Sequence, residues 1–178
     1  VNEMVIPAAR GKIVDRKGRI VAKSVYQYFK KEGEEKIYQG DGDFEGYKFE
    51  GNDLAYDLKR QYYYGEAMGL LTGYVGKVNN DDLNSGECGV KLDKNEVIGR
   101  SGAEKFFDCS LRGIDGRRLV ETDANGKYVR ELGREEPETG KDLNLSIDAY
   151  WQEKIYKMLD GKKATVIISD PSNGQILA

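Results

Sequence analysis

The stretch Arg10–Ala22, RGKIVDRKGRIVA, carries two short β-branched runs separated by a single turn. The runs are Ile13-Val14 and Ile20-Val21, and the four residues Asp15-Arg16-Lys17-Gly18 stand between them. An Asp that opens a turn and a Gly that ends it are typical of a type I turn followed by a G1 bulge. The stretch therefore predicts a β-hairpin near the start of the chain.

The same turn chemistry occurs twice more, although the sequence itself does not repeat. Asp123–Gly126 separates two candidate strands within RRLVETDANGKYVREL (117–132), and Asp170–Gly174 follows the apolar run Ala164–Ser169. Both turns predict hairpins. Because Ala164–Ser169 is apolar on successive positions, we expect it to be buried on both faces, as in the middle of a larger sheet.

Other short strands are predicted between glycine-containing turns. They are EKIYQG (35–40), GYKFEG (46–51) and the alternating segment LNLSI (143–147). The 22 glycines agree with many short strands joined by tight turns. The polar, Asn- and Asp-rich residues 77–96 are interpreted as a loop.

Two segments predict helices, and EAMGLLTGYVG (66–76) predicts a short helix or turn. Ser101 and Glu104 have the spacing of a capping box, in which each side chain bonds the other residue's amide. The helix that begins there ends at Gly113 and has an apolar stripe of Ala103, Phe106, Phe107 and Leu111.

The second helix is AYWQEKIYKMLD (149–160), with Asp148 as its N-cap and Gly161 as its stop. Its apolar stripe is Trp151, Ile155, Met158 and Leu159. We therefore interpret Trp151 as a core residue. Together, the elements predict an α+β, hairpin-rich fold of short antiparallel strands with two or three short helices.

The composition excludes several classes of protein. With 39 % hydrophobic and 33 % charged residues, the 178-residue chain has a modest core, and a net charge of −3 offers no footprint for nucleic acid. No apolar run approaches the roughly 20 residues that span a bilayer. The first nine residues, VNEMVIPAA, are no signal peptide, so we expect the numbering to begin inside a longer protein.

The sequence lacks a residue type and a motif that common catalytic sites use. There is no histidine, and none of the seven serines is followed by lysine at the third position, so no S-x-x-K motif exists. Two separated cysteines, Cys88 and Cys109, are more often unpaired than bridged, and Cys109 is interpreted as a small core residue, with one disulfide as the alternative.

Cofactor and metal sites are not expected either. Adjacent carboxylates such as Asp81-Asp82 and Glu135-Glu136 are interpreted as solvated, and DGDFEG (41–46) lacks the full spacing of a Ca²⁺ loop. The residues alone thus indicate a non-catalytic domain for binding, spacing or assembly.

Five segments, taken in order, resemble class B penicillin-binding proteins. RGKIVDRKGRIVA resembles their R-G-x-I-x-D-R-x-G-x-x-L-A signature, with Val21 where the family prefers Leu. The other four are KRQYYYGEAMGLLTGYVG (59–76), GRSGAEKFFDCSLRGIDG (99–116), GKDLNLSIDAYWQEKIYKMLD (140–160) and ATVIISDPSNGQILA (164–178). The departures are Tyr63 or Tyr64 in place of the usual Pro, Ala103 in place of Leu and Phe107 in place of Tyr.

The resemblance implies the N-terminal pedestal, or dimerisation domain, of a peptidoglycan D,D-transpeptidase. It assigns residues 1–163 to the pedestal and 164–178 to the first strands of a transpeptidase domain that is cut short, with the catalytic serine beyond them. We expect residues after about 163 to be frayed, or paired in a way that the full-length protein does not use. The parent is expected outside the cytoplasm, held by an N-terminal membrane anchor.

The partners that the resemblance implies are the transpeptidase domain itself, other cell-wall synthesis or division proteins, and a second copy in a homodimer. No nucleic acid, cofactor or metal is expected. The alternative is an independent extracytoplasmic binding domain with a different partner.

Structural roles are assigned to eight residues and a partner surface to three more. The structural set is Arg10, Gly11, Asp15, Arg16, Gly18, Gly102, Glu104 and Gly113. Arg10 and Arg16 either pair with carboxylates, Glu104 being one candidate, or are solvated, in which case Glu104 only caps its helix. Tyr62, Tyr63 and Tyr64 either form a partner surface or pack onto a sheet.

Overall fold

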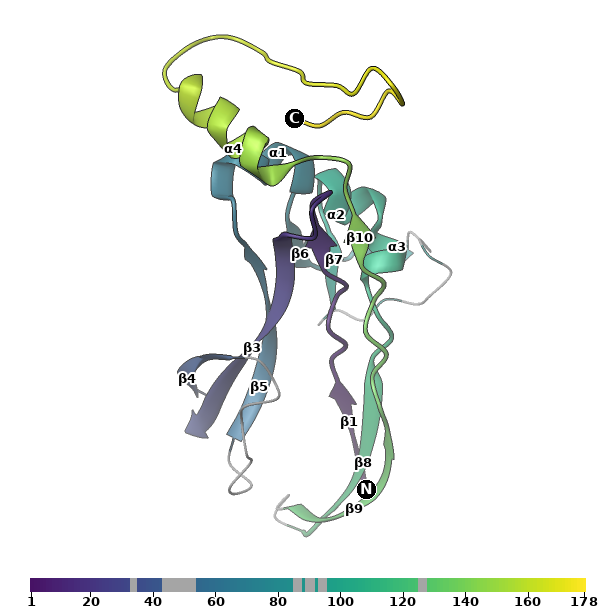
Figure 1. Ribbon diagram of the computed structural model, residues 1–178. Coiled ribbons are helices and arrows are strands. Elements are labelled where there is room, and N and C mark those ends of the chain that lie inside the picture. Colours follow the sequence, from purple (N-terminus) through teal and green to yellow (C-terminus); the bar gives the residue numbers. More distant parts are fainter. Residues whose placement is uncertain (33–34, 43–53, 85–87, 89–91, 93–95, 125–127) are drawn as a thin grey trace. The chain divides into compact units, whose positions relative to one another are not determined.

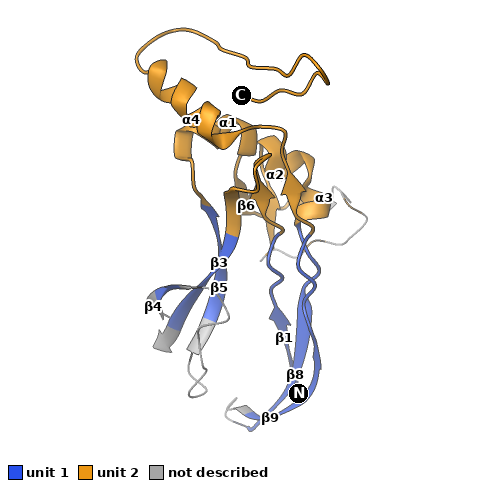
Figure 2. Ribbon diagram, in the orientation of Figure 1, with its two compact units in different colours: residues 1–10, 24–61, 112–140 blue, residues 11–23, 62–111, 141–178 orange. Residues whose placement is uncertain are grey.

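The computed structural model describes residues 1–178 except 33–34, 43–53, 85–87, 89–91, 93–95 and 125–127, and they divide into two compact units (Figure 1, Figure 2). Unit 1 holds residues 1–10, 24–61 and 112–140, and unit 2 holds residues 11–23, 62–111 and 141–178. Within these described ranges, no helix is long and apolar enough to cross a membrane. The described part of the chain contains short, mostly antiparallel strands and four α-helices, which confirms the predicted α+β fold class.

Unit 1 is built from antiparallel strands. β1 (Asn2–Ile6), β8 (Gly116–Thr122) and β9 (Tyr128–Glu135) form a sheet in the order β1-β8-β9. In addition, β3 (Ile20–Glu32), most of which lies in this unit, pairs with β4 (Glu35–Gly42) and with β5 (Leu54–Tyr62). The hairpin predicted within 117–132 and the strand predicted at 35–40 are confirmed, whereas Gly126 and the strand predicted at 46–51 lie outside the described residues.

The hairpin predicted from Arg10–Ala22 is confirmed. β2 (Ile13–Val14) pairs antiparallel with the start of β3 and parallel with β10 (Leu143–Asn144). Gly18 closes the turn at φ +77°, a left-handed conformation that glycine adopts without steric cost, and its amide donates to the carbonyl of Asp15 at 2.9 Å. The register shifts between Ile13 and Val14, as a bulge requires.

The helices of unit 2 are α1 (Gly65–Thr72), α2 (Gly102–Phe106), α3 (Asp108–Leu111) and α4 (Ala149–Met158). A two-stranded sheet joins β6 (Val75–Lys77) to β7 (Val97–Gly99), and a 3₁₀ turn, η2, covers Asp82–Asn84. The predicted polar loop therefore contains some regular structure.

One predicted helix is in fact two short ones. The segment Ser101–Gly113 breaks at Phe107, between α2 and α3. Ser101 occupies the N-cap position, but its side chain makes no capping bond, so that half of the predicted capping box is wrong. The reason is local: Gly102 has φ +56°, so the backbone leaves the regular helical path right after Ser101.

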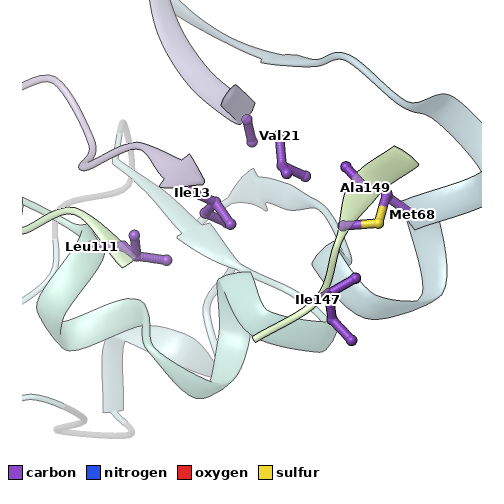
Figure 3. Packing of buried hydrophobic residues seen from close by; sticks show 7 residues of the cluster. Ile13, Val21, Met68, Leu111, Ile147 and Ala149 are labelled. Carbon is purple, nitrogen blue, oxygen red and sulfur yellow. The ribbon is translucent and has the colours of Figure 1, made fainter. Parts of the chain in front are cut away.

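Unit 2 has one main hydrophobic cluster (Figure 3). Its buried members are Ile13, Val21, Ala22, Met68, Leu111, Ile147 and Ala149. They come from the hairpin, from α1, from α3 and from the segment that leads into α4, so the cluster gathers parts of the chain that are far apart in sequence. These side chains give the Arg10–Ala22 hairpin its apolar support.

Helix α4 corrects a prediction. Its period is helical and Asp148 is its N-cap, as expected, but Trp151 is 49 % exposed and Met158 is 71 % exposed. Trp151 packs edge-on against Tyr150, with ring centroids 5.5 Å apart, and is not a core residue. Apolar periodicity places these side chains on one face but does not supply a partner for that face.

The C-terminal segment is ordered by backbone bonds but is not buried. A hairpin forms around Asp170–Gly174, where the amide of Gly174 donates to the carbonyl of Asp170 at 2.8 Å. Its strands meet in a single bridge, Ser169 to Ile176. The hairpin is thus confirmed, and because the segment is hydrogen-bonded, it is not frayed; a pairing that the full-length protein does not use stays a prediction. Ile167 is 71 % exposed, and burial of Ala164–Ser169 within a larger sheet likewise stays a prediction.

Candidate functional site

Asp15 lies at the centre of a polar cluster in unit 2. Its carboxylate is almost completely buried, at 1 % exposure, yet both oxygens are occupied. Oδ1 accepts from the amides of Lys17 and Arg19, each at 2.8 Å, and Oδ2 accepts from Arg19 Nε at 2.8 Å and from the amide of Ala149 at 3.1 Å. A buried carboxylate is stable only when it is bonded in this way.

The electrostatics of Asp15 follow from these bonds. Burial alone opposes ionisation, but the amide of Arg19 and the other donors outweigh it and hold the pKa of Asp15 below its ordinary value. Asp15 is therefore an anion at neutral pH. Its negative charge faces the guanidinium of Arg19 at 2.8 Å.

Arg19 joins Asp15 to a second carboxylate, Asp148. Nη2 of Arg19 pairs with Oδ1 of Asp148 while Nε pairs with Asp15. Burial disfavours the charged guanidinium, but the bonds to Asp148 and Asp15 raise the pKa of Arg19 further above its ordinary value. We call Asp15, Arg19 and Asp148 the carboxylate–arginine node.

The node also holds the start of α4 and the C-terminal segment. Oδ1 of Asp148 accepts from the amide of Tyr150 at 3.1 Å, which makes Asp148 the N-cap of α4. The amide of Asp148 donates to the carbonyl of Leu177 at 2.8 Å, and Oγ of Ser146 donates to the carbonyl of Ile176 at 2.8 Å. The first hairpin, α4 and residues 176–177 therefore meet at one place.

Arg10 and Arg16, for which ion pairs are one of the two predicted roles, each bind another part of the chain through the backbone amide. Arg16 is exposed, and its amide donates to the carbonyl of Ile147 at 3.0 Å. Arg10 is buried, and its amide donates to Oγ of Ser24 at 3.1 Å. Glu104 is completely buried in unit 2, and the pairing of Arg10 or Arg16 with it stays a prediction.

Three of the glycines to which structural roles are assigned lie in close contact with the backbone of other segments. A Cβ on Gly102 would lie 2.6 Å from the amide nitrogen of Gly73, so α2 can approach the end of α1 only if residue 102 has no side chain. A Cβ on Gly113 would lie 2.3 Å from the carbonyl oxygen of Glu138, within unit 1. The amide of Gly11 donates to the carbonyl of Leu111 at 2.8 Å.

The three tyrosines of the predicted partner surface, residues 62–64, differ in their burial. Tyr62 and Tyr64 pack against the main cluster, as a structural role requires, whereas Tyr63 is 46 % exposed. The amide of Tyr63 donates to the carbonyl of Val21 at 3.0 Å, which ties this segment to β3. A partner surface at this place therefore rests on Tyr63 and stays a prediction.

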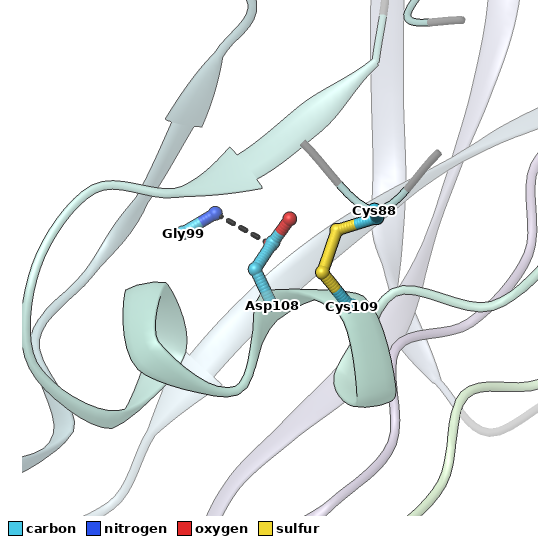
Figure 4. Close-up of a disulfide and its surroundings, with 4 residues drawn as sticks. All are labelled: Cys88, Gly99, Asp108 and Cys109. Atoms are coloured by element: carbon cyan, nitrogen blue, oxygen red, sulfur yellow. Dashed lines mark hydrogen bonds between the residues drawn. A yellow bond between two sulfur atoms is a disulfide. The ribbon is translucent and has the colours of Figure 1, made fainter. Parts of the chain in front are cut away.

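Cys88 and Cys109 form a disulfide with their Cα atoms 5.3 Å apart (Figure 4). The expectation of two unpaired cysteines is wrong, and so is the core role of Cys109, whose side chain is exposed. Sequence separation gives no signal here, because only the fold brings the two residues together. Among the described residues, no three His, Cys, Asp or Glu side chains gather as metal ligands would.

Sequence reasoning misses Arg19 and the pairing role of Asp148. The signature points to Asp15 and Arg16, and it does not indicate that Arg19, three residues beyond Arg16, pairs with both Asp15 and Asp148. The sequence predicts Asp148 only as a helix cap. No local pattern relates position 19 to position 148, since 129 residues separate them.

Comparison with known proteins gives relatives in one family. The chain is 36 % identical to the peptidoglycan D,D-transpeptidase MrdA of Acinetobacter baumannii over 132 residues, which are 74 % of this chain and 20 % of that protein. It is 31 % identical to penicillin-binding protein 3 of Bacillus subtilis over 67 % of this chain and 17 % of that protein. The chain thus spans about a fifth of the length of these relatives.

Solved structures agree on the fold. One matching structure is a complex between penicillin-binding protein PBP2 and MreC from Helicobacter pylori. The match has a TM-score of 0.68 at 19 % sequence identity, and it covers 99 % of our chain and 42 % of the chain in that structure. A second matching structure is a peptidoglycan synthase complex, with a TM-score of 0.57 at 27 % sequence identity. That match covers 83 % of our chain and 30 % of the chain in that structure. Residues 30–145 match the family model described as the penicillin-binding protein dimerisation domain, and the chain belongs to that family.

Proposed function

We propose that this chain is the non-catalytic pedestal of a peptidoglycan D,D-transpeptidase, which holds the catalytic domain away from the membrane. The observation that carries the proposal is the 36 % identity to MrdA of Acinetobacter baumannii, confined to a fifth of that protein. The absence of histidine and of an S-x-x-K motif in this sequence favours a structural role over a catalytic one.

The carboxylate–arginine node supports a role in positioning the segment next to the pedestal. In our proposal, residues 1–163 are the pedestal and residues 164–178 are the first strands of the transpeptidase domain. The backbone amide of Asp148 and the hydroxyl of Ser146 donate to the carbonyls of residues 177 and 176, so these bonds connect the segment to the part of the chain that carries the node. Val166, Ile167 and Ile176 expose apolar side chains, as strands of a larger sheet would do without their neighbours.

The disulfide supports a location outside the cytoplasm. Structural disulfides persist in oxidising compartments such as the periplasm and are rare in the cytosol. The Cys88–Cys109 bond therefore agrees with a domain on the outer side of the cell membrane, joined to it in the parent protein by an N-terminal anchor.

Partners are proposed from the relatives. The matched structures contain PBP2 together with MreC, and a peptidoglycan synthase complex. We propose that this domain likewise contacts cell-wall synthesis or division proteins, with Tyr63 on one contact surface, and that a homodimer is a further arrangement to test.

A labelling experiment with fluorescent penicillin tests the proposal. The 178-residue chain is expected to remain unlabelled, while the full-length protein expressed from its gene acquires a covalent label at a serine beyond residue 178. Competition with unlabelled penicillin is the control for specific acylation. Labelling of the 178-residue chain, or a full-length protein that never reacts, would refute the pedestal assignment.

A further inference from the structure

The disulfide of unit 2, drawn in Figure 4, joins two residues that both line an open depression at the surface. Cys109 is exposed, Cys88 is partly exposed, and both line a cavity of about 470 Å³ together with Gly102, Lys105 and Phe106. A disulfide is exchanged only if a thiolate can reach one of its sulfur atoms. We propose that Cys88–Cys109 is a thiol–disulfide exchange site, and that its oxidation state controls how firmly β6 and β7 are anchored to α3.

The exchange is a two-step reaction with a dithiol protein or a small dithiol. A thiolate of the reductant attacks Sγ of Cys109, the more exposed residue, and forms a mixed disulfide, while the bond to Cys88 breaks and Cys88 leaves as a thiolate that takes up a proton. The second thiol of the reductant then attacks the mixed disulfide and releases Cys109 as a thiol. The protein gains two electrons and two protons, and the dithiol becomes a disulfide; the reverse reaction installs the bond.

Helix α3 is the element whose attachment the bond changes. Four residues are too few for a helix that is stable by itself, so α3 depends on its external contacts. Asp108 is buried and accepts from the amide of Gly99 in β7 at 2.8 Å, and Cys109 carries the bond to Cys88. Consecutive residues of α3 thus hold β7 and Cys88, one by a hydrogen bond and the other covalently.

The remaining residues of α3 connect it to the main cluster. The carbonyl of Ser110 accepts from the amide of Lys141, and the carbonyl of Leu111 accepts from the amide of Gly11, both at 2.8 Å. The Leu111 side chain is completely buried in the main cluster. Reduction leaves these contacts intact, so its effect should be confined to the β6–β7 side of α3.

The β6–β7 lobe, by which we mean the described residues between Val75 and Gly99, has little apolar support of its own. Its cluster consists of the buried side chains of Val78, Leu92 and Ile98, with Leu83 partly buried against them. The apolar surface that these described residues bury does not by itself offset the ordering of their backbone, so a covalent link adds stability that matters here. The disulfide between Cys88 and Cys109 is that link.

The backbone conformation of Cys88 is a second reason to expect that reduction loosens the attachment of the lobe to α3. Cys88 has φ +65°, the left-handed conformation that a non-glycine residue adopts at a cost. The bond to Cys109 helps to hold it there. Once the bond is broken, Cys88 can return to an ordinary conformation, which favours the detached state.

Amide hydrogen exchange of the native chain tests the proposal, before and after treatment with dithiothreitol. The reporters in the lobe are the amides of Val78, which donates to Glu96, and of Gly99, which donates to Asp108; those of the main cluster region are Asp15 and Tyr63. Reduction is expected to speed exchange of the lobe amides by about 100-fold and to leave the amides of Asp15 and Tyr63 unchanged.

A double variant, Cys88→Ser with Cys109→Ser, is the matched control. Its lobe amides should exchange fast with and without dithiothreitol; if this variant fails to fold, the chemically reduced native chain gives the same comparison. A disulfide that resists dithiothreitol until denaturant is added would overturn the exchange site. Unchanged lobe amides, or equal acceleration at Asp15 and Tyr63, would overturn the local anchoring.

Discussion

The surroundings of Asp15 and the β6–β7 lobe belong to the same unit but are stabilised in different ways. Around Asp15, seven buried apolar side chains pack together and a buried carboxylate accepts four hydrogen bonds. Among the described residues of the lobe, three buried side chains form the cluster, and a disulfide and the ion pair Arg100–Asp82 stabilise it in addition.

The difference shows what a small apolar cluster requires. Burial stabilises in proportion to the apolar area removed from water, so a three-residue cluster contributes much less than a seven-residue one. Specific links then decide whether the smaller part stays folded. We expect substitutions near Asp15 to cost more stability than substitutions in the lobe.

The largest effect is expected for Asp15→Ala. The change leaves the amides of Lys17, Arg19 and Ala149 without their acceptor and removes one partner of Arg19, which should lower the free energy of unfolding by about 3 to 5 kcal/mol. Urea denaturation followed by circular dichroism measures it. Asp160→Ala, at an exposed position, is the control, and equal costs for both would show that the node adds no stability.

The two apolar clusters are compared directly by Ile13→Ala and Val78→Ala. Ile13 is completely buried in the larger cluster, so its truncation should cost about 3 to 4 kcal/mol of global stability. Val78→Ala removes less volume from a cluster with fewer neighbours and should cost about 1 to 2 kcal/mol. Chemical denaturation gives both values, and a larger loss for Val78→Ala would reverse our ranking of the clusters.

The backbone contact between the lobe and α2 is tested by Gly99→Ala. A Cβ at this position would lie 2.0 Å from the carbonyl oxygen of Glu104, so β7 or α2 must move, at a cost of about 2 to 3 kcal/mol. Gly133→Ala in β9 is a matched strand glycine whose Cβ would meet nothing closer than 3.9 Å, and it should change stability by less than about 0.5 kcal/mol. Similar thermal midpoints for the two variants would contradict the close approach of β7 to α2.

The smallest effect is expected from titrating Asp82. Its bonds with Arg100, and then with the amide of Asn79, hold the pKa of Asp82 below its ordinary value, so the stabilisation is present above the unfolded pKa and is lost as pH falls through the folded one. The protection factor of the Asn79 amide, which donates to Asp82 at 2.6 Å, compares its exchange rate with the intrinsic rate at the same pH, and it should therefore fall on acidification below about pH 4. Asp82→Asn should remove this pH dependence, and its persistence in the variant would assign it to another group.

Local sequence patterns predict those parts of the fold that depend on neighbours in the chain. The Asp15–Gly18 turn, the β8–β9 hairpin and the Asp148 cap each follow from a few adjacent residues, and the structure contains all three. Helical periodicity likewise locates α4, although it wrongly makes Trp151 a core residue. Burial depends on the residues that pack against a face, and periodicity does not contain that information.

The site is predictable only in part, because its partners are far apart in sequence. The signature identifies Asp15, yet its bonds to Arg19 and Ala149 and the pairing of Arg19 with Asp148 follow from tertiary packing. The Cys88–Cys109 bond escapes prediction for the same reason, since a separation of 21 residues fits bridged and free cysteines alike. Motif resemblance identifies the family because it uses the order of several motifs along the chain.

The two oxygens of Asp15 have a consequence for the order of folding. Among the described residues, Oδ1 accepts only from amides of its own turn, at most four residues away, whereas Oδ2 also accepts from the amide of Ala149, 134 residues further along the chain. During synthesis the turn can close as soon as Arg19 has emerged. The hydrogen bond from Ala149 to Oδ2 can form only after residue 149 has been synthesised. The first hairpin thus offers a ready-made binding point on which the end of the domain completes its assembly.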